Sequence, residues 1–148
     1  MNLSRNVKVT QALGYYAAGQ TLRLSDAIDM SGYEGCMFII ELGTIISTGV
    51  LTAALSECAT TGGSYVAAPT AAPSVATVNA TTAAYVKSCM VYDVFQPKKQ
   101  FIKLSVTPSV ANAVICGITA IQYNGKVKPS VNDVSVLVST FQQSPDEA

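Results

Sequence analysis

The sequence predicts a single all-β domain, an antiparallel β-sandwich or jelly roll of about eight strands. Three observations predict it. Short apolar runs recur along the chain and are separated by turn residues. Apolar and polar side chains alternate over residues 101–106, as they do on a half-buried strand. A chain of 148 residues is also long enough to bury one core without a metal or a disulfide. An open antiparallel barrel is the alternative.

Eight segments of the chain have strand patterns. They are residues 1–12, 20–24, 36–42, 50–58, 85–95, 101–106, 113–123 and 130–140. The first and the last of them would be edge strands or extended arms of the domain. Residues 50–58 also contain helix formers at Ala53–Leu55, but their short distance from the preceding strand favours a strand. No other segment has a convincing helical pattern.

Turn residues bound these segments. Residues 113–123 carry no charge on either face, so we expect this strand to be covered on both sides. Thr107–Ser109 is predicted to end the strand before it, and Asn124-Gly125 to form a tight hairpin turn after it. The other predicted breaks are Gly43 after 36–42, a turn at 15–19 and a loop at 26–35.

A long neutral segment, residues 59–84, interrupts the strand pattern. It contains two prolines, Pro69 and Pro73, and no charged residue. It is too long for a hairpin turn and too poor in large apolar residues for a core, so it is predicted to be an extended surface loop. Such a loop would suit packing against another protein, which makes Tyr65, Val66 and the two prolines candidate interface residues. A disordered insertion is the alternative.

The C-terminal stretch, residues 130–148, has a different pattern. Val134, Val136 and Val138 alternate with mostly polar residues, which predicts an eighth strand or a β-forming arm. An arm of this kind can add a strand to the sheet edge of a partner. These three valines and Phe141 are therefore candidate interface residues, while the last seven residues are expected to be frayed.

The charge of the chain argues against several function classes. Charged residues make up 12% of the chain, about half of the usual proportion, and nine basic residues balance nine acidic ones. Nucleic-acid binding is not expected, because phosphate contacts need clustered Lys and Arg. No apolar run reaches the length of a membrane span, and the N-terminus has no signal-peptide core, so we expect synthesis in the cytoplasm. A surface so poor in charge favours burial in an assembly.

The sequence contains no catalytic or metal-binding motif, so an enzyme is not expected. The chain has no histidine, which removes the commonest general base and the usual partner of a nucleophilic Ser or Cys. It has no Cys-x-x-Cys pair either, so neither a metal nor another cofactor is expected. All four cysteines are expected to be buried free thiols. They are Cys36, Cys58, Cys89 and Cys116.

Two clusters of charged residues have ordinary explanations. Asp26, Asp29 and Glu34 resemble part of a calcium loop, but Glu34 stands where that loop requires glycine, so a solvated turn is favoured. Lys98 and Lys99 lie in the turn before residues 101–106. They form either a solvated corner or a contact with a phosphate or an acidic patch on a partner, and both are candidate interface residues.

Two stretches carry a family resemblance. Residues 29–43 read DMSGYEGCMFIIELG, and residues 92–129 begin YDVFQPKKQFIKLSV and end ANAVICGITAIQYNGKVKP. Together they resemble small structural proteins encoded in the head gene clusters of tailed phages and prophages. In that family an aspartate-rich turn before a strand, a proline-basic turn before a second strand, and an Ala-Ile-Gln-Tyr strand with a basic-proline end recur in this order.

The resemblance implies a head decoration (cement) protein with a jelly-roll fold. Such a protein would be a homodimer or homotrimer on the capsid exterior of the virion. It would bind the major capsid protein of the expanded head and stabilise the shell. The contact would be made by a terminal arm, residues 1–12 or 130–140, together with the neutral loop.

Two other function classes stay open. One is a different virion component, such as a tail or fibre-base module. The other is a carbohydrate-binding module on the same sandwich fold, in which aromatic faces would stack on sugar rings. That module would need an exposed row of tyrosines, and the candidates are Tyr15, Tyr16, Tyr33 and Tyr65.

Overall fold

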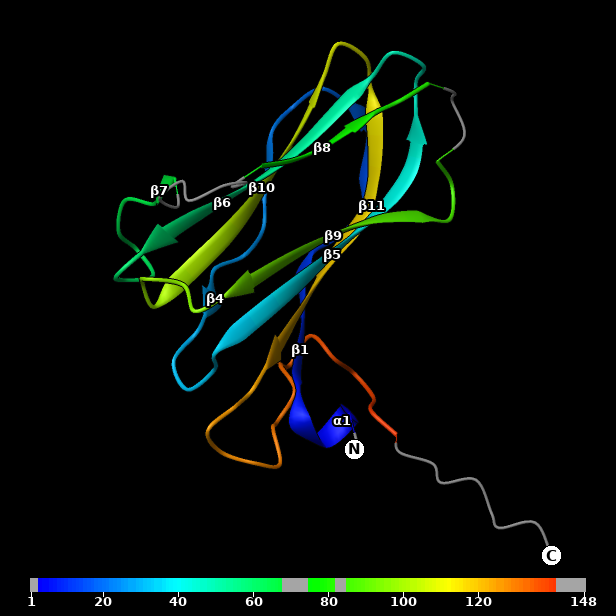
Figure 1. Cartoon of the computed structure of the whole chain (residues 1–148). Helices are drawn as coiled ribbons and strands as arrows, with labels where there is room; N and C mark the ends of the chain where they lie inside the picture. The colour runs from blue at the N-terminus through cyan, green and yellow to red at the C-terminus, as the bar shows by residue number, and fades with distance from the viewer. Residues whose placement is uncertain (1–2, 68–74, 82–84, 141–148) are drawn as a thin grey trace, which may run out of the picture.

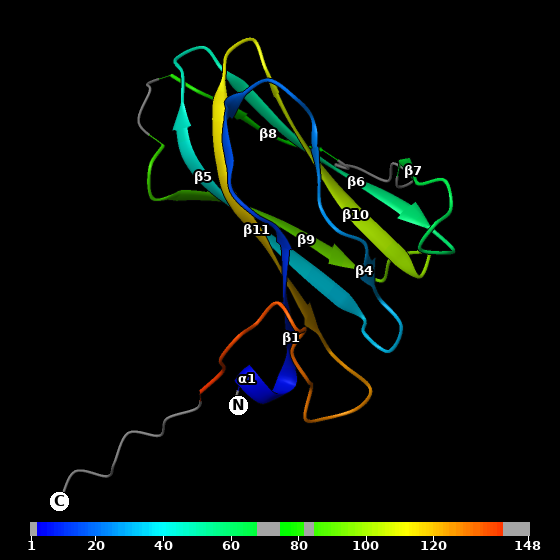
Figure 2. The ribbon, with the colours of Figure 1, turned by 180° about the vertical axis from the view of Figure 1, so that it is seen from behind.

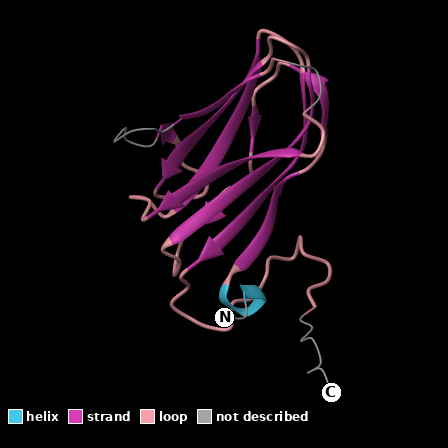
Figure 3. Ribbon diagram, turned by 45° about the vertical axis from the view of Figure 1, so that its right-hand side comes forward, coloured by secondary structure: helices cyan, strands magenta, loops and turns pink. Residues whose placement is uncertain are grey.

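The chain folds into two antiparallel sheets that pack face to face, as a computed structural model shows for residues 3–67, 75–81 and 85–140 (Figure 1). The predicted fold class, an all-β sandwich, is confirmed. Figure 3 shows the strands as two layers, with one short helix, α1 (Leu3–Asn6), before the first strand. Within the described residues, no helix is long and apolar enough to cross a membrane.

The first sheet, sheet A, has four strands in its main order. They are β1 (Lys8–Leu13), β11 (Ala113–Tyr123), β5 (Gly35–Ile45) and β9 (Ser88–Phe95). A further short strand, β2 (Tyr16–Gly19), pairs with the beginning of β11 where β1 no longer does. The strands β1 and β9 therefore form the two long edges of this sheet.

The second sheet, sheet B, is built around two central strands, β10 (Phe101–Ser109) and β6 (Val50–Cys58). The flanking strands are short. They are β3 (Arg23–Leu24) and β4 (Ile28–Asp29) on β10, and β7 (Val66–Ala67) and β8 (Val75–Asn79) on β6. Sheets A and B share no ladder among the described strands, which agrees with the sandwich and not with the open barrel.

One apolar cluster fills the space between the sheets. Phe38 and Ile40 of β5 and Ile118 of β11 meet Leu51 of β6 and Leu104 of β10, and all five side chains have no exposed surface. Alternation along each strand places every second residue in this cluster. Burial of one such side chain stabilises the fold by about 1.5–3 kcal/mol.

Strand β5 confirms the predicted strand at 36–42 but continues through Gly43, which was wrongly predicted to end it. The pairing of β5 with β11 shifts register here, between Ala113 and Ile115. A Cβ atom on Gly43 would lie 2.7 Å from Cγ1 of Val114. Glycine is therefore needed at position 43 because β5 and β11 approach each other closely there, and not because the chain turns.

Strand β11 is covered mainly on one face, so the prediction of two covered faces is wrong. Ile115 and Ile118 are both buried, because the register shifts again between Ile115 and Gly117. On the outer face Thr119 and Ile121 are half-buried and Cys116 is exposed. An uncharged strand face is thus not necessarily a covered one. Asn124 adopts a positive φ of 52°, but the residues after it do not return as a hairpin strand.

Strand β10 confirms the strand at 101–106 but does not end at Thr107. It continues to Ser109 and includes Pro108, which pairs with Leu51 of β6. Proline is tolerated there because the pairing of β10 with β3 ends at Val106, so β10 has one neighbouring strand at Pro108.

Several weak segments were assigned wrongly from sequence. Residues 16–19 form β2 instead of a turn, and the strand predicted at 20–24 shortens to β3. The loop predicted at 26–35 contains β4, and the one at 59–84 contains β7 and β8. Each of these short strands flanks a longer strand of its sheet. Backbone pairing with the longer strand compensates for a weak local preference for strand structure.

Candidate functional site

The C-terminal segment, defined here as residues 126–140, lies outside both sheets. The sequence predicts a strand or arm over 130–140, but no strand forms there. Instead the segment leaves the end of β11 and runs beside β1 and α1 (Figures 1 and 2). The peptide N–H of Asp133 donates to the carbonyl of Val9 at 3.1 Å. The N–H groups of Val9 and Gln11 donate to side chains, to Asn132 Oδ1 at 3.0 Å and to Ser135 Oγ at 2.9 Å.

These contacts cover the edge of β1 with two side-chain hydrogen bonds and one backbone hydrogen bond, and not with a regular ladder. The peptide N–H of Ser135 donates to Asp133 Oδ1 at 3.0 Å, and the Ser135 hydroxyl donates to the same oxygen at 2.8 Å. Both hydrogen bonds lower the pKa of the Asp133 carboxyl. A side chain that accepts backbone hydrogen bonds competes with strand pairing. The alternation of valines therefore does not become a strand.

The segment exposes five large apolar side chains. Their exposed fractions are 79% for Val127, 79% for Val131, 93% for Val134, 92% for Leu137 and 80% for Val138. Of the predicted interface valines, Val134 and Val138 are thus almost fully exposed, whereas Val136 is half-buried. Single exposed apolar residues are normal on a protein surface, but five on one segment of fifteen residues make this segment a candidate interaction site.

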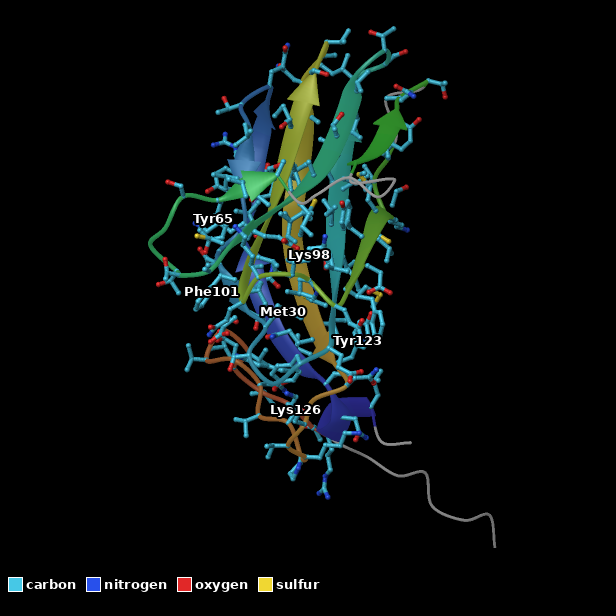
Figure 4. All side chains as sticks on the ribbon, turned by 60° about the vertical axis from the view of Figure 1, so that its left-hand side comes forward. Met30, Tyr65, Lys98, Phe101, Tyr123 and Lys126 are labelled. Carbon is cyan, nitrogen blue, oxygen red and sulfur yellow. The ribbon has the colours of Figure 1, made fainter. Side chains whose placement is uncertain are left out.

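A basic pocket adjoins this segment at the same end of the sandwich. Its volume is about 470 Å³. It lies between the turn at residues 30–34, the β9–β10 connection at residues 96–100, and Lys126. In Figure 4 the labelled Met30, Lys98 and Lys126 lie along this region. The lining contains three lysines, including Lys99, and one acidic residue, Glu34. Its charge therefore favours an anionic group on a partner.

Two carboxylates order the loops around the pocket. Asp29 Oδ1 accepts hydrogen bonds from the Ser31 N–H at 2.8 Å and from Gln100 Nε2 at 3.1 Å. Glu57, which is only 4% exposed, accepts one from the Lys98 N–H at 3.2 Å. The acidic turn at 26–34 thus braces the β9–β10 connection. In the described part of the chain, no group of three His, Cys, Asp or Glu residues is placed to hold a metal ion.

Of the other predicted interface residues, Val66 lies near this pocket, Tyr65 contacts Lys103, and three lie outside the described residues. Val66 of β7 is 51% exposed and pairs with Glu57, the residue that binds Lys98. Tyr65 stacks under Lys103, whose Nζ lies 4.3 Å from the ring centre, and its hydroxyl donates to Thr61. Pro69, Pro73 and Phe141 lie outside the described residues. Val66 and Lys98, far apart in sequence, are therefore neighbours around Glu57.

The tyrosines proposed for sugar binding do not form one row. Tyr16 pairs with Ile115 and holds Arg23 at 4.1 Å from its ring centre. Tyr33 contacts Gly125 and lines the basic pocket. Ile115 and Gly125 are separated by most of the length of β11, which is roughly 30 Å. The two rings therefore lie near opposite ends of sheet A.

The cysteine prediction is right for two residues and wrong for the other two. All four thiols are free, and Cys36 and Cys58 are buried, but Cys89 and Cys116 are exposed. Burial, together with the nearby Asp93 carboxylate, raises the pKa of Cys36 to about 12. The exposed pair lies on β9 and β11 of sheet A, whose outer face is only partly covered.

Sequence reasoning missed most of the pocket. Met30, Tyr33, Gln96, Gln100 and Lys126 all line it. The basic-proline run Lys126–Pro129 was the one available signal for Lys126, but only the fold brings it to the loop that carries Lys98. No protein-family model and no curated protein sequence matches the chain.

Proposed function

We propose that the protein is a capsid decoration protein that binds the major capsid protein of an expanded phage head. The observation that supports this most strongly is the exposure of five large apolar residues on the C-terminal segment, from Val127 to Val138. Water contact with so many apolar side chains is unfavourable, and a protein partner would remove it. The resemblance to head structural proteins supplies the identity of that partner.

The contact would combine an apolar and a charged part. The C-terminal segment would fill an apolar groove of the shell protein, while Lys98, Lys99 and Lys126 would face acidic side chains beside that groove. Lys126 both lines the pocket and begins the segment, so the two parts form one continuous surface. Paired charges at the rim of an interface mainly raise the association rate and make it salt-dependent.

Stabilisation of the shell would follow from differential binding. A protein that binds the expanded lattice and not its precursor shifts the equilibrium toward the expanded state. At a free concentration one hundred times the Kd, this amounts to about 2.7 kcal/mol for each occupied site. The protein needs no catalytic group for this function.

The direct test is co-sedimentation of the full-length protein with empty expanded heads. The triple variant V134S/L137S/V138S should bind roughly a hundredfold more weakly or worse, because about 1 kcal/mol or more is lost for each apolar side chain that leaves the interface. The single variant Val86→Ser is a control, since Val86 is 62% exposed and lies outside the C-terminal segment.

Binding of the wild-type protein should also raise the melting temperature of the heads. Equal co-sedimentation of the triple variant and the wild type would refute the role of the segment. If the wild-type protein bound no heads at all, the proposed function would be wrong. Immunogold labelling of tails instead of heads would point to another virion component.

A further inference from the structure

The edges of the two sheets differ in how they are protected. A strand edge has unpaired N–H and C=O groups that can pair with another chain, and proteins block such edges with short strands, Lys, Pro, bulges or covering segments. At the edges of sheet B, β3, β4 and β7 have two residues each and β8 has five. In sheet A, β1 has Lys8 and a register shift, and Asn132, Asp133 and Ser135 cover its edge.

Within the described residues, the opposite edge of sheet A, strand β9, has none of these devices. Its eight residues, Ser88–Phe95, contain neither Pro nor Lys. They pair with β5 in an unbroken register, from Gly35 opposite Phe95 to Leu42 opposite Ser88. Among the described strands, β9 has β5 as its only ladder partner. It is therefore a long, regular edge strand suited to pairing with another chain.

The one charged residue of β9, Asp93, is held away from the open edge. The Tyr123 hydroxyl of β11 donates to Asp93 Oδ1 at 2.7 Å across the intervening strand β5. The Tyr123 ring lies over Gly35, where any Cβ atom would clash with it. Burial and this hydrogen bond raise the pKa of Tyr123 to about 12, so the hydroxyl remains a donor at neutral pH. The charge thus does little to block the edge.

We propose that β9 is a self-association site, at which β9 of one copy pairs antiparallel with β9 of a second copy. The two copies of sheet A would then form one continuous sheet around a twofold axis. Such a contact is isologous, because the same surface is used by both partners. Val91 and Phe95 lie on the same outer face of β9 and are 55% and 58% exposed, and pairing of two copies would place these apolar side chains on one shared face. This favours a second copy of this chain as the partner, and the assembly is a dimer.

The geometry of antiparallel pairing limits the register of this contact. Directly opposed residues point to the same face of the sheet, so a residue of the outer face must oppose another residue of the outer face. The twofold axis must therefore pass between the two copies of one residue, so that this residue opposes its own copy. With most of β9 paired, that residue is Val91 or Tyr92. The outward Val91, which is 55% exposed, would oppose either its own copy or Asp93 of the second copy.

This self-association does not depend on the proposed shell binding. The C-terminal segment covers the β1 edge, and β9 forms the other edge of sheet A. A dimer would leave the segment free to bind the shell. Loss of dimerisation with retained head binding, or the reverse, would separate the two proposals.

The test is sedimentation equilibrium of the full-length protein. The wild type should be a concentration-dependent dimer. Val91→Asp should weaken the dimer by roughly tenfold or more, because the new carboxylate would oppose either its own copy or Asp93. Leu24→Asp is the matched control, since Leu24 is 51% exposed on the short edge strand β3, and its dimer should be unchanged.

Hydrogen exchange of the wild-type protein gives a second readout that requires no variant. Backbone amides of β9 should exchange more slowly as the protein concentration rises, while those of β3 should not change. A wild-type monomer at high concentration, a dimer unaffected by Val91→Asp, or β9 amides whose exchange is independent of concentration would each overturn the proposal.

Discussion

Strand β11 and the C-terminal segment follow each other in the chain, and both contain alternating apolar residues, yet their surroundings are opposite. Ile115 and Ile118 of β11 are at most 1% exposed, whereas Val134 and Leu137 of the segment are more than 90% exposed. Strand β11 has a neighbouring strand on each side and lies under sheet B. The segment makes scattered hydrogen bonds to the edge of β1, to Arg5 of α1 and to Gly32, and it pairs with no strand. Apolar alternation therefore makes a strand only where backbone partners and a covering layer are both available.

The largest expected effect separates these two regions directly. Ile118→Ala should lower the free energy of unfolding by about 3 kcal/mol, because it removes a fully buried side chain and leaves a cavity. Leu137→Ala should change it by less than about 0.5 kcal/mol, since Leu137 is almost fully exposed. Urea denaturation followed by circular dichroism measures both. Similar losses for the two variants would mean that the segment belongs to the folded core.

A smaller effect contrasts a buried thiol with an exposed one. Burial, followed by the Asp93 charge, raises the pKa of Cys36 from 9.0 to about 12. The folded protein thus holds this proton more tightly than the unfolded chain does. The stabilisation is complete below pH 9 and is lost as the pH rises from 9 toward 12.

Between pH 9 and pH 10.5, this thiol should reduce the free energy of unfolding by roughly 1 to 2 kcal/mol. Denaturation at a series of pH values should show a steep decline for the wild type and a shallower one for Cys36→Ala. Cys116→Ala, which changes an exposed thiol of β11, should keep the wild-type slope. Parallel slopes for the wild type and Cys36→Ala would contradict the assignment.

The part of the fold that could be predicted from sequence is the part where local pattern and tertiary surroundings agree. β5, β6 and β10 carry alternating or strongly apolar runs and form the centre of the sandwich. The strands that were missed, such as β2 and β8, are short, and Val75–Asn79 of β8 has no large aromatic or leucine side chain. Such segments become strands because β11 and β6 offer them free edges, which a linear sequence does not show.

The candidate site was less predictable, for the same reason. The sequence indicates Lys98, Lys99 and the valines of residues 130–140 as interface candidates. It does not indicate that Lys126 would join Lys98, because 27 residues and two strands separate them. Nor does it reveal that Val66 and Lys98 would meet around a buried Glu57. These proximities depend on sheet order and register.

A small effect on stability is also expected from removing the last seventeen residues, Asn132–Ala148. The described core cluster ends at Ala120. Among the described residues, the deletion removes a few part-buried or exposed hydrogen bonds to Val9 and Gln11, which water can replace. We expect a loss of less than about 1 kcal/mol in the free energy of unfolding, but much weaker binding to expanded heads. Thermal melts and co-sedimentation of the same truncated protein measure the two effects. Unchanged co-sedimentation would show that shell binding lies outside the segment, and a loss comparable to that of Ile118→Ala would show that the sandwich depends on it.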